Sequence, residues 1–250
     1  MHKSKKPPIM KISAYSIFVA FIAAAIVFSS FAAPDNQNNV LSKKEKAEGW
    51  KLLFDGQSTE GWHLYNGSSQ FTLWKVKNGE LFCDPNDKTG ATDLVTDNLY
   101  KNYDLKFDWK LPKGGNSGVF INVLERADLP AAWSSGPEYQ LLDDANPDFA
   151  KPEDRSGCLF SFGAQITPVK TKPANSWNHS EIKQINGKIQ FYLNGTLTTE
   201  EDFTSKAWAD KIAKSHFKAI PDFGKHLSGH IGLQDWATGI AFRNIKIKEF

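Results

Sequence analysis

The chain has 250 residues, of which 40% are hydrophobic and 23% charged, as in a folded globular protein. The formal net charge is +2, but four of the 30 Lys and Arg residues lie within the first 11 positions, which contain no Asp or Glu. The remainder carries 26 basic against 28 acidic side chains without a basic block, which argues against nucleic acid or an anionic membrane as a partner.

The first 33 residues have the three-part layout of an export signal. Basic residues up to Lys11 precede an apolar run over 12–28, and small residues end the segment at Ala32 and Ala33. Cleavage there predicts a periplasmic or secreted protein with no stable membrane partner. The alternative is an uncleaved N-terminal anchor, because the 20 residues of 14–33 are just long enough to span a bilayer.

The rest of the chain is expected to form one domain. Residues 34–47 are polar and rich in Lys and Glu, which predicts a linker with nothing to pack against, and residues 48–250 suit a single β-domain. Cys83 and Cys158 could pair in an oxidising compartment, or each could remain a small buried thiol. Two cysteines alone make no zinc site.

Hairpin and strand signals dominate this domain. Asn-Gly pairs at 78–79, 186–187 and 194–195 predict tight turns, because Asn and Gly tolerate the positive φ angles that such turns need. Residues 103–111 alternate between apolar and polar, which predicts a strand with one face in a core. A single helix is expected over 205–215.

The end of the chain predicts two more strands, over 229–235 and 240–250. In the last one, Phe242 is expected on the side opposite to Ile245. About a dozen short strands with so little helix predict an all-β fold, a β-sandwich of two antiparallel sheets with one short helix. The long loop 145–156 is either a functional rim or a neutral surface insertion.

Polar residues interrupt two apolar strands between residues 113 and 144. Glu138 and Gln140 are expected on one strand face, and Asp143 joins them only if the strand bulges near 141–142. Buried carboxylates and amides without partners cost several kcal/mol, so they usually line a wet cleft or a paired network. The pattern favours a sugar site in which Glu138 and Asp143 act as general acid and base, or only bind hydroxyls or a cation.

Other residues could complete such a site. His230 could act as a base or a metal ligand, or could be a satisfied structural residue, and Arg243 could hold oxygen anions. Trp133 and Trp236 lie in loops beside the polar strands and could stack on sugar rings. The remaining candidates for substrate binding are polar residues: Asn116, Gln234 and Asp235.

Several sequence blocks occur together and in order. They are Gly-Gly-Asn-Ser-Gly-Val-Phe (114–120), Pro-Glu-Tyr-Gln-Leu-Leu-Asp-Asp (137–144), Ser-Gly-Cys-Leu-Phe (156–160), Gly-His-Ile-Gly-Leu-Gln-Asp (229–235) and Phe-Arg-Asn-Ile (242–245). From about residue 48 to its end, the chain thereby resembles the 3-keto-disaccharide hydrolase domain family. The resemblance implies a concanavalin A-like jelly-roll sandwich and action on glycosides whose C3 hydroxyl has been oxidised to a ketone.

Such a substrate suggests its own chemistry. A C3 ketone acidifies the proton on C2, so a base can remove it, the C1 substituent can leave, and water can add back. Glu138 is expected to transfer the proton with Asp143 or His230 as its partner, while the polar residues hold oxygens. No cofactor is certain, although a divalent cation held by His230 and a carboxylate could stabilise the enolate. A noncatalytic carbohydrate-binding module and a conventional endoglucanase are the alternatives.

Overall fold

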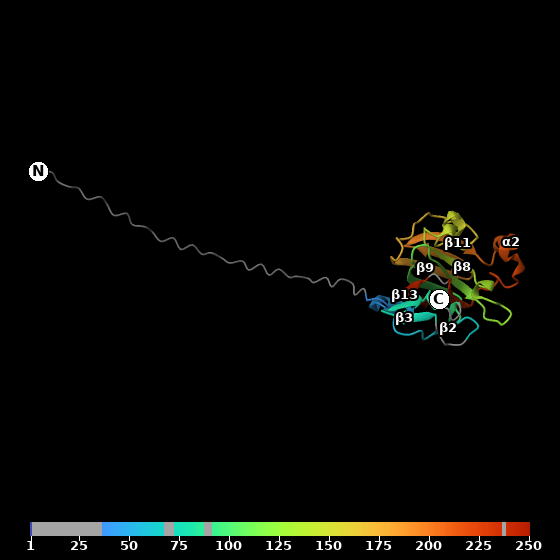
Figure 1. The fold of residues 1–250 in the computed structure, drawn as a ribbon, viewed down its shortest axis with the longest axis horizontal. Coiled ribbons are helices and arrows are strands. Elements are labelled where there is room, and N and C mark those ends of the chain that lie inside the picture. Colours follow the sequence, from blue (N-terminus) through green and yellow to red (C-terminus); the bar gives the residue numbers. More distant parts are fainter. Residues whose placement is uncertain (2–36, 68–72, 88–91, 237–238) are drawn as a thin grey trace. The chain divides into compact units, whose positions relative to one another are not determined.

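The computed structural model describes residue 1 and residues 37–67, 73–87, 92–236 and 239–250 (Figure 1). The expected export signal lies outside the described residues, apart from residue 1, and remains a prediction. All elements below belong to one compact unit formed by residues 36–250. None of the helices in the described ranges is long and apolar enough to cross a membrane.

In the described residues, thirteen strands form two antiparallel sheets. The larger sheet runs in the order β11-β10-β9-β6-β13-β4-β3, with β1 paired to β13. Its strands are β1 (Lys51–Leu52), β3 (Trp74–Lys77), β4 (Glu80–Cys83), β6 (Tyr103–Lys110), β9 (Asn178–Ile185), β10 (Lys188–Leu193), β11 (Thr196–Asp202) and β13 (Ala241–Glu249). The smaller sheet runs in the order β2-β5-β12-β7-β8. Its strands are β2 (Trp62–Leu64), β5 (Leu94–Thr96), β7 (Asn116–Val123), β8 (Glu138–Leu142) and β12 (His230–Leu233).

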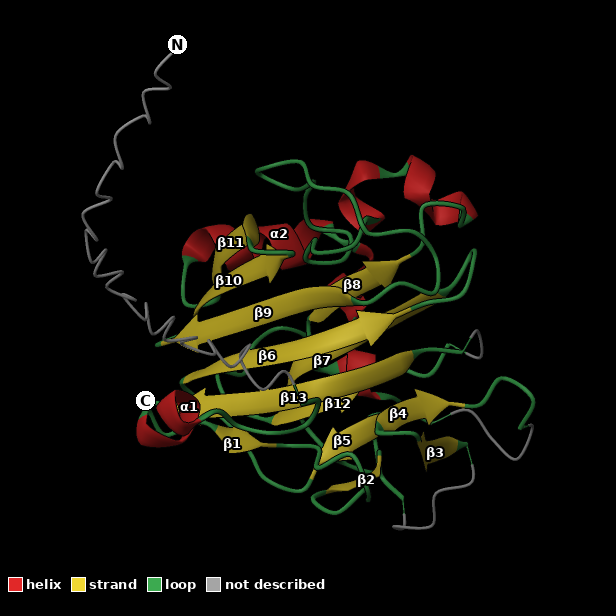
Figure 2. Cartoon of the chain, turned by 90° about the vertical axis from the view of Figure 1, so that its left-hand side faces the viewer, coloured by secondary structure: helices red, strands yellow, loops and turns green. Residues whose placement is uncertain are grey.

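The two sheets form two layers, with strands of the larger sheet in front of β7, β8 and β12 in Figure 2. The core lies between them. Alternate residues of β6, from Tyr103 to Trp109, are fully buried there, as the sequence pattern predicted. Tyr139 of β8 packs against Phe107, and its hydroxyl lies 2.8 Å from Oγ of Ser180 in the facing sheet. The predicted jelly-roll sandwich of antiparallel sheets is therefore confirmed.

The local turn predictions also hold. The Asn-Gly pairs at 78–79, 186–187 and 194–195 all have positive φ at both residues, and each joins two paired neighbouring strands. These three hairpins set the register of the strands that they connect.

The last strand departs from strict alternation. Asn244 has a φ of +53°, and the pairing of β13 with β6 shifts between Arg243 and Lys246. The bulge adds a residue, so Phe242 and Ile245 are both buried in the core. The prediction that they face opposite sides was wrong because the sequence did not reveal the bulge.

The main helix is α2 (Lys206–Lys214), within the predicted range. Oγ of Ser205 caps it by accepting a hydrogen bond from the Trp208 backbone N–H, and Trp208 and Ile212 are buried. Four short 3-10 helices are also present in the described residues. They are η1 (Ala132–Ser134), η2 (Pro147–Ala150), η3 (Pro152–Asp154) and η4 (His216–Ala219).

The segment expected to be an unpacked linker makes specific contacts instead. It contains α1 (Lys43–Ala47), whose first turn is held by reciprocal hydrogen bonds between Ser42 and Glu45. Asn39 is buried, and it exchanges two backbone to side-chain hydrogen bonds with Asn244, of 2.6 and 2.7 Å. The described part of this segment therefore packs on the sandwich.

Two further features bear on the sequence predictions. Cys83 and Cys158 are both buried and free, so they do not pair.

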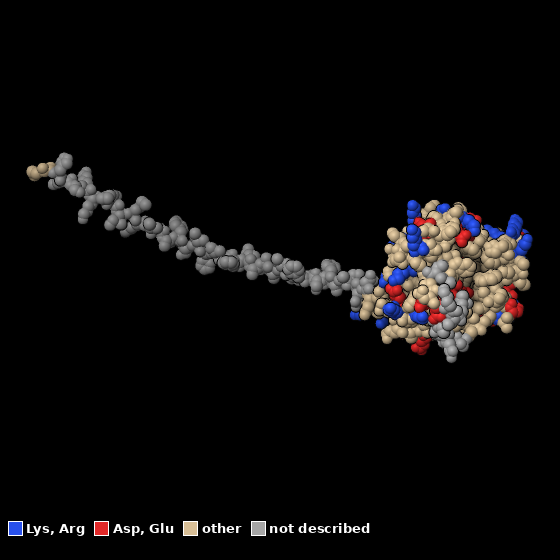
Figure 3. Space-filling view, in the orientation of Figure 1, with Lys and Arg blue, Asp and Glu red and all other residues tan. Residues whose placement is uncertain are grey.

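Lys and Arg side chains are interspersed with Asp and Glu on the face that Figure 3 shows.

Candidate active site

A cavity of about 450 Å³ lies over the outer face of the smaller sheet. Because Tyr139 and Leu141 of β8 point into the core, Glu138 and Gln140 point to the opposite face, where the cavity lies. We call this cavity the main chamber. Its lining residues are Asn116, Trp133, Glu138, Gln140, Asp148, Lys151, Asp154, Phe160, His216, Phe217, Ile220, Gln234 and Trp236.

The Glu138 side chain lies across Gly118 of the neighbouring strand β7. A Cβ at residue 118 would come within 2.0 Å of Glu138 Oε1. Glycine at this position therefore leaves the space that the carboxyl group occupies. Two neighbouring strands thus position Glu138 jointly, one by carrying it and the other by having no side chain beneath it.

The Glu138 carboxyl group is buried and incompletely hydrogen-bonded. Glu138 is 8% exposed, and its Oε1 has no hydrogen-bond partner among the described residues. Burial, and then the negative charges of Asp93 and Asp154, raise the pKa of Glu138 well above its usual value, against an opposing contact with the Gln234 amide. Burial therefore favours the protonated form of Glu138, and a carboxyl group with a raised pKa beside a cavity is suited to proton transfer.

Amides form the polar floor around Glu138. The Gln140 side chain donates a hydrogen bond of 2.9 Å to Oδ1 of Asn116. The Gln234 backbone N–H donates to the Gly118 carbonyl oxygen at 2.9 Å, while the buried Oε1 of Gln234 has no hydrogen-bond partner among the residues described. This floor offers donors and acceptors of the kind that sugar hydroxyls require.

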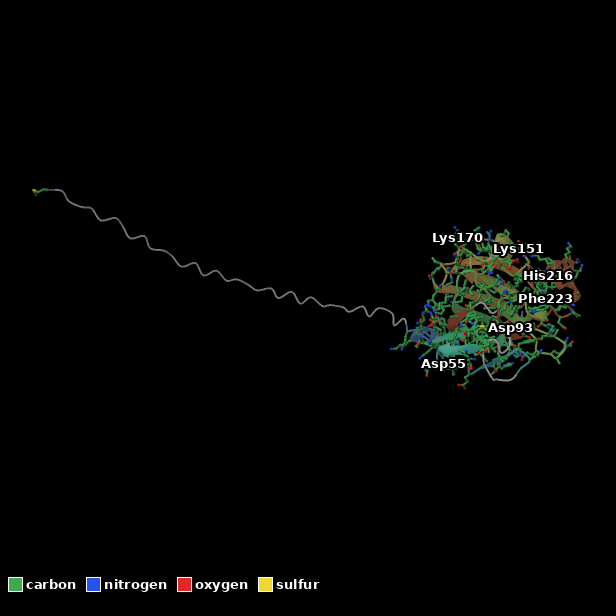
Figure 4. The ribbon with its side chains drawn as sticks, in the orientation of Figure 1. Asp55, Asp93, Lys151, Lys170, His216 and Phe223 are labelled. Carbon is green, nitrogen blue, oxygen red and sulfur yellow. The ribbon has the colours of Figure 1, made fainter. Side chains whose placement is uncertain are left out.

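An aromatic wall closes one side of the main chamber. Phe217 contributes to it and stacks on Phe223 with ring centroids 3.8 Å apart, and His216 packs edge-on against Phe160. Figure 4 shows His216 and Phe223 close together. This apolar wall excludes water from one side of the chamber and therefore strengthens the electrostatic interactions within it.

The rim carries charge and exposed indole rings. Lys151 Nζ lies 3.3 Å from Asp148 and 3.5 Å from Asp154, and the hydrogen bond to Asp148 is the main cause that raises the pKa of Lys151. Trp133 and Trp236 are 42% and 58% exposed at the mouth. The rim therefore carries the ammonium group of Lys151, held by two carboxylates, and two indole rings that could stack on sugar rings.

A second, smaller chamber adjoins the first. Its volume is about 250 Å³, and it shares Trp133, Gln234 and Trp236 with the main chamber. We call it the Asp93 chamber. Its lining residues are Tyr65, Asn66, Thr92, Asp93, Pro130, Ala131, Trp133, Gln234, Asp235 and Trp236.

Comparison with known proteins places this cleft in context. Residues 49–248 match the family described as the 3-keto-alpha-glucoside-1,2-lyase-like domain. The chain belongs to this family. The family predicted from the sequence blocks is thereby confirmed.

Relatives of this lyase-like domain agree with the assignment. Over 229 residues the chain is 30% identical to a 3-keto-disaccharide hydrolase of Bacteroides thetaiotaomicron, covering 81% of this chain and 79% of that protein. A solved structure from Parabacteroides distasonis, described as a glycosyl hydrolase, is 32% identical with a TM-score of 0.78, covering 86% of this chain and all of that one. Another from the same organism, 24% identical with a TM-score of 0.61 over 80% of this chain and 99% of that one, shows the shared fold. These findings support a carbohydrate-active role of the glycoside hydrolase type.

In this lyase-like domain, six of the ten residues singled out from the sequence line the main chamber. They are Asn116, Trp133, Glu138, Gln140, Gln234 and Trp236. Asp235 lines the Asp93 chamber instead. The structure thus brings together residues that lie more than 100 positions apart in the chain.

Asp143 is not in either chamber. Strands β7 and β8 pair without a register shift, so the bulge that would have turned Asp143 toward Glu138 is absent from these described strands. Its Oδ1 instead accepts hydrogen bonds from the backbone N–H groups of Gly114, at 2.7 Å, and Ala145, at 3.1 Å. Asp143 holds a turn together at this position.

His230 lies at the opposite end of β12 from Gln234. Its Nδ1 is 2.5 Å from the Thr96 carbonyl oxygen, and its Nε2 is 3.5 Å from Glu125 Oε2. His230 therefore lies beside the Glu125 carboxylate and not in the chamber that Glu138 lines. Among the described residues, no group of three or more His, Cys, Asp or Glu side chains is placed to hold a metal ion.

Arg243 lies on β13 in the larger sheet, outside the cleft. Its guanidinium carbon is 4.0 Å from the ring centroid of Trp177, and its Nε is 3.4 Å from Asp108 Oδ2. The bulge at Asn244 and the strand order of the larger sheet determine this position. Arg243 is therefore engaged in a surface contact on the other sheet.

Sequence reasoning did not single out Asp93, Lys151, Asp154 or His216, which line the two chambers. The length of loop 145–156 was the available signal for Lys151 and Asp154. Asp93 and His216 carried no comparable signal, because each reaches the cleft through tertiary packing.

Proposed function

We propose that this chain is an enzyme that cleaves 3-keto-glycosides, by elimination across C1 and C2 followed by addition of water. Family membership and the relative named as a 3-keto-disaccharide hydrolase support this substrate class. The observation that carries the proposal is Glu138, whose buried carboxyl group, with its raised pKa, lies beside a chamber large enough for a small ligand.

The residues around Glu138 suit each step of such a reaction. Removing the C2 proton leaves an electron pair that moves onto the C3 oxygen, so negative charge develops there. Lys151 is the lining residue that can stabilise this charge, and the amides of Asn116, Gln140 and Gln234 can orient the hydroxyl groups. Glu138 exchanges a proton with the reacting substrate, which is general acid-base catalysis.

The remaining features suit binding and location. Trp133 and Trp236 can stack on sugar rings at the mouth, as aromatic side chains do with flat apolar faces. The export signal expected at residues 1–33 supports action in the periplasm or outside the cell.

The direct test is to incubate the purified protein with a 3-keto-disaccharide and measure product masses. The expected product has the mass of the 3-keto-monosaccharide, and a product lighter by one water would show that the reaction stops after elimination. Glu138→Gln should lower kcat by about 100-fold or more, since it removes the transferable proton and keeps the shape. Glu60→Gln, at an exposed loop position, is the matched control.

Two results would contradict the proposal. Binding of oxidised and unoxidised sugars without turnover would favour a noncatalytic binding module. Release of reducing sugar from unoxidised glucans would favour a conventional endoglucanase.

A further inference from the structure

The two chambers form one cleft with Gln234 between them. Gln234 contacts Glu138 in the main chamber, and the next residue, Asp235, binds Asp93 in the smaller chamber. The exposed indoles of Trp133 and Trp236 border both chambers. Gln234 and Asp235, which directly follow β12, therefore link Glu138 in the main chamber to the Asp93 chamber.

Asp93 is built into its chamber. It directly precedes β5, and its Oδ1 accepts a hydrogen bond of 3.0 Å from the Asp235 backbone N–H. A hydrogen bond from the Ala132 backbone also favours its ionised form. Backbone donors on two other segments thus hold this carboxylate in place.

We propose that Asp93 is the second proton-transfer residue of the cleft, working opposite Glu138 on a substrate that spans both chambers. This inference rests on the proposed function. It places the C1–C2 bond of the oxidised ring between Asp93 and Glu138, where the two chambers adjoin. Asp93 then takes the role of proton-transfer partner to Glu138. The sequence predicted Asp143 or His230 for this role, but both lie outside the chambers.

The electrostatics distinguish the roles of the two acids. Burial, together with the charge of Asp235, raises the pKa of Asp93 to about 7, although its backbone hydrogen bonds oppose the rise. The negative charge on Asp93 in turn helps to keep Glu138 protonated. Two carboxyl groups that share a site in this way divide into one base and one acid. Asp93 is the base, and Glu138 is the acid.

The proposed reaction balances in atoms and electrons. The Asp93 carboxylate takes the proton from C2, the C2–H electron pair forms the C1–C2 double bond through the enolate, and the C1–O bond breaks. Glu138 protonates the departing oxygen. Water then adds to C1 and gives a proton to the Glu138 carboxylate, while Asp93 returns its proton to C2. Both acids recover their starting states.

The test separates the two proton transfers. A 3-keto-disaccharide is incubated in D₂O, and deuterium at C2 of the recovered substrate is measured beside cleavage. Asp93→Asn should lower both exchange and cleavage by about 100-fold or more, because no base remains. Glu138→Gln should retain exchange at C2 and lose cleavage. Asp210→Asn, on the exposed face of α2, is the charge control and should leave both rates unchanged.

The pH profile of the unmodified protein provides a second measurement that does not depend on how a variant folds. Its kcat/KM should fall as the pH drops below about 7, where Asp93 becomes protonated. Wild-type exchange rates in Asp93→Asn, or a kcat/KM that stays level below about pH 7, would overturn the assignment of Asp93. If the unmodified protein neither exchanges nor cleaves the substrate, the proposed function itself fails.

Discussion

Replacing Gly118 by Ala tests how closely the neighbouring strand positions Glu138. The added Cβ would lie 2.0 Å from Glu138 Oε1, whereas ordinary contacts begin at 3.4 Å, so the carboxyl group must retreat by about 1.4 Å. A displacement of about 1 Å in a catalytic group can cost about 100-fold in rate. Because Glu138 is a flexible side chain, the loss of stability should stay near the low end of overpacking effects, about 1 kcal/mol.

The assay compares kcat on a 3-keto-disaccharide with the free energy of unfolding in urea for the same variant. Gly163→Ala is the matched control, since a Cβ at residue 163 meets nothing within 4 Å. The expected result is a fall of about 100-fold in kcat for Gly118→Ala with both proteins folded. A Gly118→Ala variant with wild-type kcat would show that the position of Glu138 does not limit the reaction.

Two further predictions concern residues outside the chambers. Arg243→Ala should leave KM and kcat unchanged, because Arg243 stacks on Trp177 in the larger sheet; a severalfold rise in KM would refute this. Burial alone would lower the pKa of His63, but hydrogen bonds to Glu125 and Asp97 outweigh it and raise that pKa. The resulting stabilisation is present below about pH 6.5 and is lost as the pH rises through the folded-state pKa. Urea unfolding should therefore show a larger difference between wild type and His63→Gln at about pH 6 than at about pH 9, and equal differences would contradict the assignment.

Local features of this fold could be predicted because their causes are local. The Asn-Gly turns need positive φ at two adjacent residues, and the alternation over 103–111 follows directly from the period of a strand. The bulge at Asn244 could not be predicted in this way. It depends on how β13 pairs with β6, a strand about 140 positions earlier in the chain.

The site was predictable only where neighbouring residues share a strand face. Glu138 and Gln140 meet for that reason. Gln234 directly follows the strand that His230 begins, and the four positions of extended chain between them span about 13 Å, so His230 cannot reach the same chamber. Asp93 approaches Asp235 because β5 pairs with β12, and nothing in the sequence near Asp93 indicates that pairing.

The position of β13 affects how the protein is made. Residues 241–249 form this strand, which lies inside the larger sheet between β6 and β4 and also pairs with β1. During synthesis, one edge of β6 and one edge of β4 stay unpaired until residues 241–249 have been made. Fragments that end before residue 241 would therefore expose two strand edges, which are sites of aggregation. The larger sheet can complete its strand pairing only after residues 241–249 have left the ribosome.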